Sequence, residues 1–140
     1  MGIVIKLSNL PDIERNGIMK PVIYCCSDQA LIEKAVSLNI EIAKRLTVVK
    51  PNRRTMRLEQ CFQQVLGTLP DNVVIKDFDV MFNPDYAVDV LRIICSAART
   101  KSFRVLWPGK YENDRLIYAE EGFGDYKVFQ ISKYDVTVVV

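Results

Sequence analysis

Two aspartates, Asp77 and Asp79, are the residues of this sequence best suited to chemistry. They follow an apolar run that ends at Lys76. If the chain is extended here, side chains two residues apart point to the same side, so both carboxylates could hold one hard cation such as magnesium. The Asp-x-Asp pattern is short, and we favour a simpler interpretation in which Asp79 caps the next helix or turn and Asp77 is solvated.

A second candidate site lies at Ser27, Asp28 and Gln29, which follow the apolar run 22–26. The junction between a strand and a helix is where α/β folds bind ligands, and backbone N–H groups there can hold an anion. A phosphate-binding loop would place glycines and a Lys-Ser or Lys-Thr pair here, and the sequence has neither. Asp28 would also repel phosphate by about 1 kcal/mol at close range. We therefore favour helix capping by Ser27 or Asp28.

Four cations, Lys50, Arg53, Arg54 and Arg57, gather in one short segment, although the net charge of the chain is only +2. If they contact a nucleic-acid backbone, about four phosphate contacts would make binding strongly dependent on salt. No aromatic residue is interleaved with them, so stacking on bases is not supported. A contact with an acidic partner protein, or a solvated charged face, explains the group at least as well.

The chain contains no histidine. This removes the commonest general base, the Ser-His and Cys-His nucleophile pairs and the commonest zinc ligand. The four cysteines, Cys25, Cys26, Cys61 and Cys95, lack Cys-x-x-Cys spacing and indicate free thiols, mostly buried, in a reducing cytoplasm. No apolar run approaches the roughly 20 residues of a membrane span, so we expect a cytoplasmic protein without membrane contact.

The elements that must position these residues begin with strands. Length and a hydrophobic fraction of 49% indicate a single domain over residues 1–140. An apolar run without alternation predicts a central strand over 22–26. Strands are also predicted over 73–76 and 103–107, which with the helix between them form one crossover unit of a parallel sheet. Residues 3–5 predict a short edge strand, and Pro11 followed by Asp-Ile-Glu-Arg predicts a helix start.

Two amphipathic helices are predicted between the strands. One is capped by Thr55 and ends at Gly67, and the other starts at Asn83-Pro84-Asp85. Their apolar stripes follow the i, i+3, i+4 pattern and predict four core residues: Leu58, Phe62, Leu91 and Ile94.

The segment 28–46 is ambiguous. Periodicity favours one helix whose stripe consists of Leu31, Ala35, Leu38, Ile42 and Leu46. Alternatively, a short strand over 36–38 separates two short helices and completes a layered α/β pattern.

The last third of the chain predicts strands. A polar turn over 110–115 is followed by strand-like runs at 116–118, 126–129 and 136–140. We expect the last run to be exposed, so that it can add an edge to a partner's sheet. The aromatic residues of this third are predicted to be mostly core, with any exposed subset marking a protein interface: Tyr111, Tyr118, Phe123, Tyr126, Phe129 and Tyr134.

Several short runs between residues 36 and 130 resemble the small BrxF family of the bacterial BREX phage-defence systems. The runs are Asp79-Val80-Met81-Phe82-Asn83-Pro84, Asp89-Val90-Leu91-Arg92, Val105-Leu106-Trp107-Pro108-Gly109, and Leu116-Ile117-Tyr118-Ala119-Glu120 with Gly122, Asp125 and Tyr126.

The resemblance implies a P-loop-NTPase-like fold of the AAA+ kind, a three-layer α/β sandwich with a mostly parallel sheet and, here, a β-rich C-terminal part. It implies ATP as the default ligand, a second strand and its exit at Ser37-Leu38-Asn39, and a following helix that carries Arg45 and Leu46. The chain departs from the family at both phosphate-handling positions. The Gly-rich loop is absent after Cys26, and Lys76 stands where the family's magnesium-anchoring aspartate belongs.

These observations predict a catalytically silent subunit of a BREX-like defence complex that acts through contacts with other proteins, homo-oligomerisation included. In this interpretation the chain has no catalytic residue, metal site or cofactor. One alternative is a divergent magnesium- and ATP-dependent enzyme that uses Asp77 and Asp79, with Ser27, Asp28, Gln29 and Lys76 near the nucleotide. The other is a nucleic-acid-binding adaptor that uses the basic group.

Overall fold

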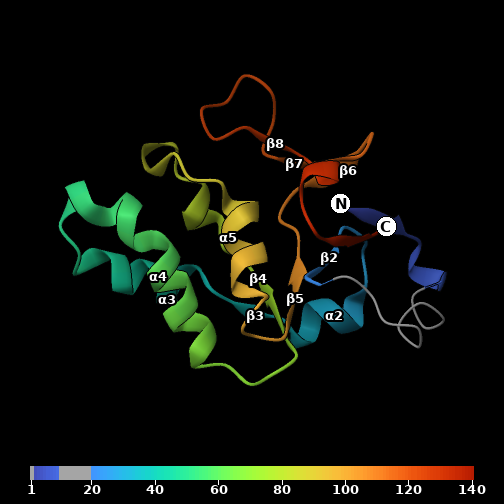
Figure 1. Ribbon diagram of the computed structural model, residues 1–140, viewed down its shortest axis with the longest axis horizontal. Helices are drawn as coiled ribbons and strands as arrows, with labels where there is room; N and C mark the ends of the chain where they lie inside the picture. The colour runs from blue at the N-terminus through green and yellow to red at the C-terminus, as the bar shows by residue number, and fades with distance from the viewer. Residues whose placement is uncertain (1, 10–19) are drawn as a thin grey trace.

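The computed structural model of the protein describes residues 2–9 and 20–140 (Figure 1). The helix start predicted after Pro11 lies outside the described residues. The main sheet has six strands in the order β1-β9-β2-β5-β4-β3, and every neighbouring pair is parallel. This confirms an α/β fold with a mainly parallel sheet. The strands are β1 (Ile3–Ile5), β2 (Val22–Tyr24), β3 (Val36–Ser37), β4 (Val73–Lys76), β5 (Phe103–Leu106) and β9 (Thr137–Val139).

Helices cover both faces of this sheet. Alternate residues of β2 point to opposite sides, so Ile23 packs in one cluster while Val22 and Tyr24 pack in another. Leu31 of α2 (Gln29–Lys34) belongs to the second cluster. The first cluster holds the apolar stripes of α3 (Asn39–Thr47), α4 (Arg54–Gly67) and α5 (Val90–Ala97). The four predicted core residues of α4 and α5 are all 0% exposed, which confirms those stripes: Leu58, Phe62, Leu91 and Ile94.

The segment 28–46 folds as helix, strand and helix, so the single helix favoured by periodicity is wrong. Leu31 packs on one face of the sheet, whereas Leu38 and Ile42 pack on the other. One apparent stripe is therefore two half-stripes separated by β3. Backbone pairing with β4 decides the outcome, because Val36 pairs with Ile75 and the N–H of Leu38 continues the ladder to the carbonyl of Lys76 at 3.0 Å.

Two predicted helix starts are also wrong. The helix expected at residues 83–85 begins at Val90, after two short 3-10 turns, η3 (Asp79–Phe82) and η4 (Pro84–Tyr86). Ala87 interrupts the helical path with a φ of 49°, and Asp89 then caps α5. Helix α4 begins at Arg54, directly after η2 (Pro51–Arg53), so Thr55 lies inside the first turn and is not the cap.

A second sheet, in the order β6-β7-β8, is antiparallel and confirms the β-rich C-terminal part. Its strands are β6 (Lys110–Glu112), β7 (Arg115–Tyr118) and β8 (Lys127–Gln130). The polar turn predicted over 110–115 is instead strand β6 over residues 110–112 and the start of β7 at Arg115. Only Asn113 and Asp114 form the turn, with φ of 51° and 60°, which is the pair of positive values that a two-residue hairpin needs.

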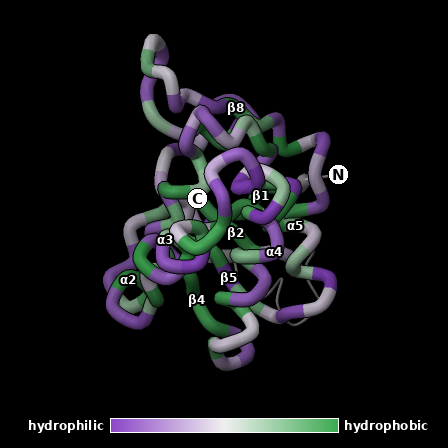
Figure 2. Tube along the Cα trace, turned by 90° about the vertical axis from the view of Figure 1, so that its left-hand side faces the viewer, coloured by the Kyte–Doolittle hydropathy of each residue, from purple (hydrophilic) through white to green (hydrophobic). Residues whose placement is uncertain are grey.

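The C-terminal run is not an exposed edge, so its predicted role in extending a partner's sheet is wrong. Strand β9 lies between β1 and β2 and pairs with both. Val136 and residues 137–139 are all 0% exposed. An apolar run without alternation is typical of a parallel strand buried on both faces. Figure 2 shows hydrophobic residues along the central strands and hydrophilic residues mainly at the periphery.

Candidate functional site

The two aspartates after β4 do not form a pair. Asp77 has a φ of 51°, so the chain turns sharply at the end of the strand and the extended geometry that would align the two carboxylates is absent. Asp77 accepts a hydrogen bond from the hydroxyl of Ser37. Asp79 accepts one from the hydroxyl of Tyr118 at 2.9 Å and another from the side-chain amide of Asn39 at 3.4 Å. Each carboxylate is thus tied to a different element.

Asp79 is a structural anchor in this arrangement and not a helix cap. The N-cap position of η3 is Phe78, and the N–H of Val80 is bound by Asn39 Oδ1 at 2.9 Å. Burial and the adjacent Asp79 raise the pKa of Tyr118, which therefore remains a hydrogen-bond donor. The network joins the start of α3, the end of β4 and strand β7. It fixes the second sheet against the carboxyl end of the first.

The described residues contain no group of three or more Asp, Glu or Cys side chains placed to hold a metal ion. Within the same part of the chain, no ion pair joins Lys76 to Asp77 or Asp79.

Ser27, Asp28 and Gln29 lie together at the start of α2, as predicted. Asp28 Oδ1 accepts hydrogen bonds from the backbone N–H groups of Ala30 at 3.0 Å and Leu31 at 3.4 Å, which confirms the capping role. Gln29 contacts Glu33 at 3.3 Å. Strand β5 lies between β2 and β4, so the strand that precedes Asp28 is not adjacent to the strand that precedes Asp77 and Asp79.

All four cysteines are free, and Cys25 and Cys95 are poor nucleophiles. Burial, with a smaller effect of Cys26, raises the pKa of the Cys25 thiol to about 12. Burial, assisted by Asp89 and Asp135, raises the pKa of the Cys95 thiol to about 11. The thiolate is the reactive form of cysteine. A thiol with so high a pKa stays protonated at neutral pH and is therefore a poor nucleophile.

These pKa values predict that the free energy of unfolding falls as pH rises above about 9. Above that pH the unfolded chain has lost protons that the folded chain still holds on Cys25 and Cys95, so alkali favours unfolding. Urea unfolding at several pH values between about 8 and 11 measures the slope. The variant Cys25→Ala/Cys95→Ala is expected to show a shallower slope. An identical slope in both proteins would contradict the assignment.

Three of the four predicted cations converge on a groove between α3 and α4. We call this the basic groove; its cavity volume is about 410 Å³. Arg54 points elsewhere: its Nε donates to the carbonyls of Leu46 at 3.1 Å and Val49 at 3.2 Å and so closes the end of α3. The residues that line the groove are Arg45, Val48, Val49, Lys50, Arg53, Arg57, Gln60, Cys61 and Gln64.

Arg45 is the groove residue that charge clustering in the sequence missed. It lies on α3, and only the antiparallel return of α4 brings Arg53 and Arg57 to it. Arg45 also pairs with Glu41 at 3.3 Å. Among the described residues that line the groove, none is acidic. The groove can therefore accept several negative charges at once.

Two exposed hydrophobic side chains accompany these cations. Val48 in the groove is 86% exposed, and Met56, next to Arg53 and Arg57 on the adjoining surface of α4, is 80% exposed. Neither contributes to the core. A partner that covers this surface would remove apolar area from water and neutralise the cations together.

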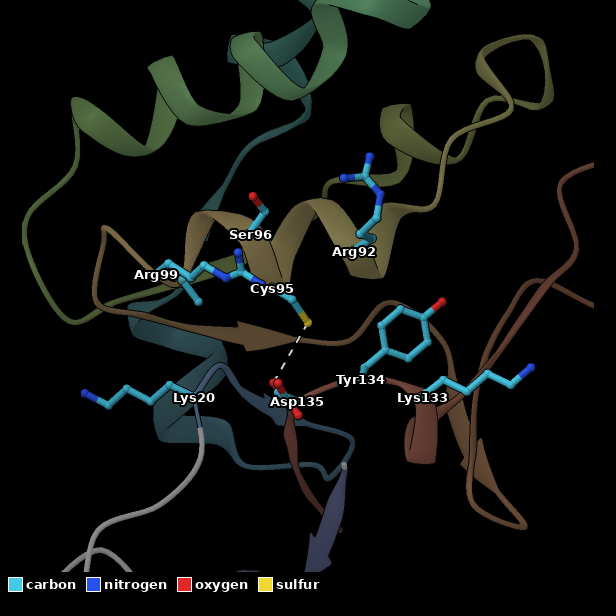
Figure 3. A pocket seen from close by; sticks show the side chains of 9 residues that line it. Lys20, Arg92, Cys95, Ser96, Arg99, Lys133, Tyr134 and Asp135 are labelled. Carbon is cyan, nitrogen blue, oxygen red and sulfur yellow. Dashed lines mark hydrogen bonds between the residues drawn. The ribbon is translucent and has the colours of Figure 1, made fainter.

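A larger cavity of about 550 Å³ lies beside α5, and no pattern in the sequence predicts it. Its cations do not converge: Figure 3 shows Lys20, Arg92 and Lys133 extending in different directions. The Cys95 thiol faces the backbone carbonyl of Asp135 at 3.9 Å. This arrangement lacks the common focus of a binding site.

No family model, curated protein or solved structure matches this chain. The described residues include no helix long and apolar enough to cross a bilayer.

Proposed function

We propose that this chain is a catalytically silent, P-loop-like subunit of a bacterial BREX-like antiphage defence complex, and that it acts by binding another protein through the basic groove. One observation carries the proposal. The acidic residues near the expected phosphate-handling positions serve the fold, because Asp28 caps α2 and Asp79 is bound by Tyr118 and Asn39. In the basic groove, by contrast, Lys50 and Arg53 form no ion pair with any other described residue, and the Val48 side chain is 86% exposed.

The P-loop-like part of the proposal is supported by the segment after β2. The resemblance implies a strand at Ser37 and a following helix with Arg45 and Leu46. Strand β3 ends at Ser37, and α3 carries both residues. Periodicity alone favours a single helix over residues 28–46. The agreement between the resemblance and the structure therefore does not depend on periodicity.

The enzyme alternative requires Asp77 and Asp79 to share a cation, and their separate hydrogen bonds weigh against it. A nucleic-acid-binding adaptor is the second candidate, because Arg45, Lys50, Arg53 and Arg57 line one groove. It predicts binding that weakens steeply with salt, by a log-log slope of about −0.9 per phosphate contact on a DNA duplex.

The test uses a phage-sensitive host that carries this gene together with its genomic neighbours. We expect Asp28→Asn and Asp79→Asn to retain phage protection, because the amide oxygen of asparagine still accepts from the backbone of α2 at position 28 and keeps one of the two acceptor sites at position 79. We expect Arg53→Glu/Arg57→Glu to lose protection and to lose co-purification with the neighbouring gene products. The control Lys34→Glu/Lys133→Glu makes the same change of charge at two exposed sites elsewhere and should behave as wild type.

Loss of protection in a stably folded Asp79→Asn protein would support the enzyme alternative instead. Saturable binding of Mg-ATP at micromolar concentration that disappears in that variant would do the same. We expect Mg-ATP at about 1 mM to leave the melting temperature unchanged, because a ligand that binds the native state would raise it.

A further inference from the structure

The loop between β7 and β8, residues 119–126, carries acidic side chains and one aromatic side chain that complement the cations and exposed apolar residues of the basic groove. It contains Glu120, Glu121 and Asp125 around Phe123, and we call it the acidic loop. Figures 1 and 2 both show it standing out from the body of the protein. Phe123 is 64% exposed, whereas Tyr118 and Phe129, which flank the loop, are buried.

The conformation of the acidic loop is fixed locally. The N–H of Phe123 bonds to the carbonyl of Glu120, and the N–H of Tyr126 bonds to the carbonyl of Phe123, both at 3.2 Å. Gly122 has a φ of 96°, which a side chain at that position would disfavour. These two turns hold the aromatic ring outward between carboxylates. A presenting loop that is already ordered loses little conformational entropy on binding.

We infer that the basic groove binds the acidic loop of a second copy of this chain. The inference rests on the proposed function, which makes the groove a binding surface, and it names the occupant. Three carboxylates would face Arg45, Lys50, Arg53 and Arg57, while Phe123 would cover Val48 and Met56. Residues 119–126 do not line the groove of their own chain, so the contact is between copies.

The exposed apolar side chains at the groove favour the acidic loop over a nucleic acid as the bound group. A phosphate backbone would neutralise the cations but would leave Val48 and Met56 in water. Among the described groove residues there is no aromatic side chain on which a base could stack. The acidic loop supplies both the negative charge and the apolar ring.

The geometry of such a contact determines how it assembles. Loop and groove are different surfaces, so one contact between two copies leaves one groove and one loop, which either engage each other in a closed two-fold dimer or bind further copies in an open chain. One loop in one groove is smaller than a standard interface of about 1,600 Å². We therefore expect a weak association that strengthens with protein concentration and weakens as salt is raised.

Sedimentation velocity of the purified full chain, at protein concentrations up to about 1 mM, tests this inference. We expect wild type to self-associate. The groove variant Arg53→Glu/Arg57→Glu and the loop variant Glu120→Gln/Glu121→Gln/Phe123→Ala should each raise the dissociation constant at least about tenfold. Lys34→Glu/Lys133→Glu and Glu33→Gln/Glu112→Gln/Ile32→Ala make matching changes of charge and remove an exposed apolar side chain elsewhere, and they should associate as wild type.

The decisive sample is an equimolar mixture of the groove variant and the loop variant. The first retains an intact loop and the second an intact groove, so the mixture should form a heterodimer that grows no further. A wild-type chain that stays monomeric, or a mixture that does not pair, would overturn the inference. Binding of a DNA or RNA oligonucleotide by a monomeric wild type but not by the groove variant would assign the groove to nucleic acid. Phage protection and partner capture test the proposed function separately, since a monomer can still bind a different defence protein.

Discussion

Removing residues 136–140 is expected to leave a chain without a cooperative unfolding transition. Strand β9 pairs with β1 on one side and β2 on the other, so its loss breaks two ladders and detaches β1. Val136, Val138 and Val139 are 0% exposed. Burying one such side chain contributes about 1.5–3 kcal/mol. The three together represent a large part of a total stability of about 5–15 kcal/mol.

Urea unfolding followed by far-UV circular dichroism measures this effect. The control is Val140→Ala, because this side chain is 36% exposed and should matter little. A truncated protein with an unchanged midpoint would show that β9 is dispensable and that the strand order of the sheet is wrong.

The sequence predicts where the helices and strands of this fold lie better than it predicts which elements they pack or pair with. An apolar run without alternation indicates a strand at 136–140, but the same pattern fits a buried central strand and an exposed edge. The position of β9 depends on β1 and β2, which lie more than 110 residues earlier in the chain. The local sequence pattern of a strand contains no information about which distant strand it pairs with. For the same reason, the stripe over 28–46 did not reveal that its two halves face opposite sides of the sheet.

The candidate site shows the same limit at the level of side chains. Capping by Asp28 is local, since its partners are two and three residues away, and it was predicted correctly. Asp79 bonds to Tyr118, which is 39 residues away, and its structural role was not predictable from the Asp-x-Asp spacing. In the basic group, Arg54 differs from Arg53 only because it meets the carbonyls that end α3.

An aromatic cluster joins the two sheets, and Phe82 is its centre. Its ring is stacked on Tyr118, with centroids 3.7 Å apart and planes within 5°. It also meets Trp107 edge to face at 5.8 Å and Phe129 at 6.4 Å. Strand β5 ends just before Trp107, whose ring is buried among these residues and therefore reports on the cluster.

Phe82→Ala is accordingly expected to lower the free energy of unfolding by about 3–5 kcal/mol, because it removes a fully packed ring and leaves a cavity. Stacking of Tyr118 is lost as well, and with it the orientation of the hydroxyl that donates to Asp79. Urea unfolding monitored by Trp107 fluorescence measures the change. Phe123→Ala is the matched control, since that ring is 64% exposed and the variant should lose little stability. Equal midpoints for the two variants would mean that the second sheet is held by its hydrogen bonds and not by this cluster.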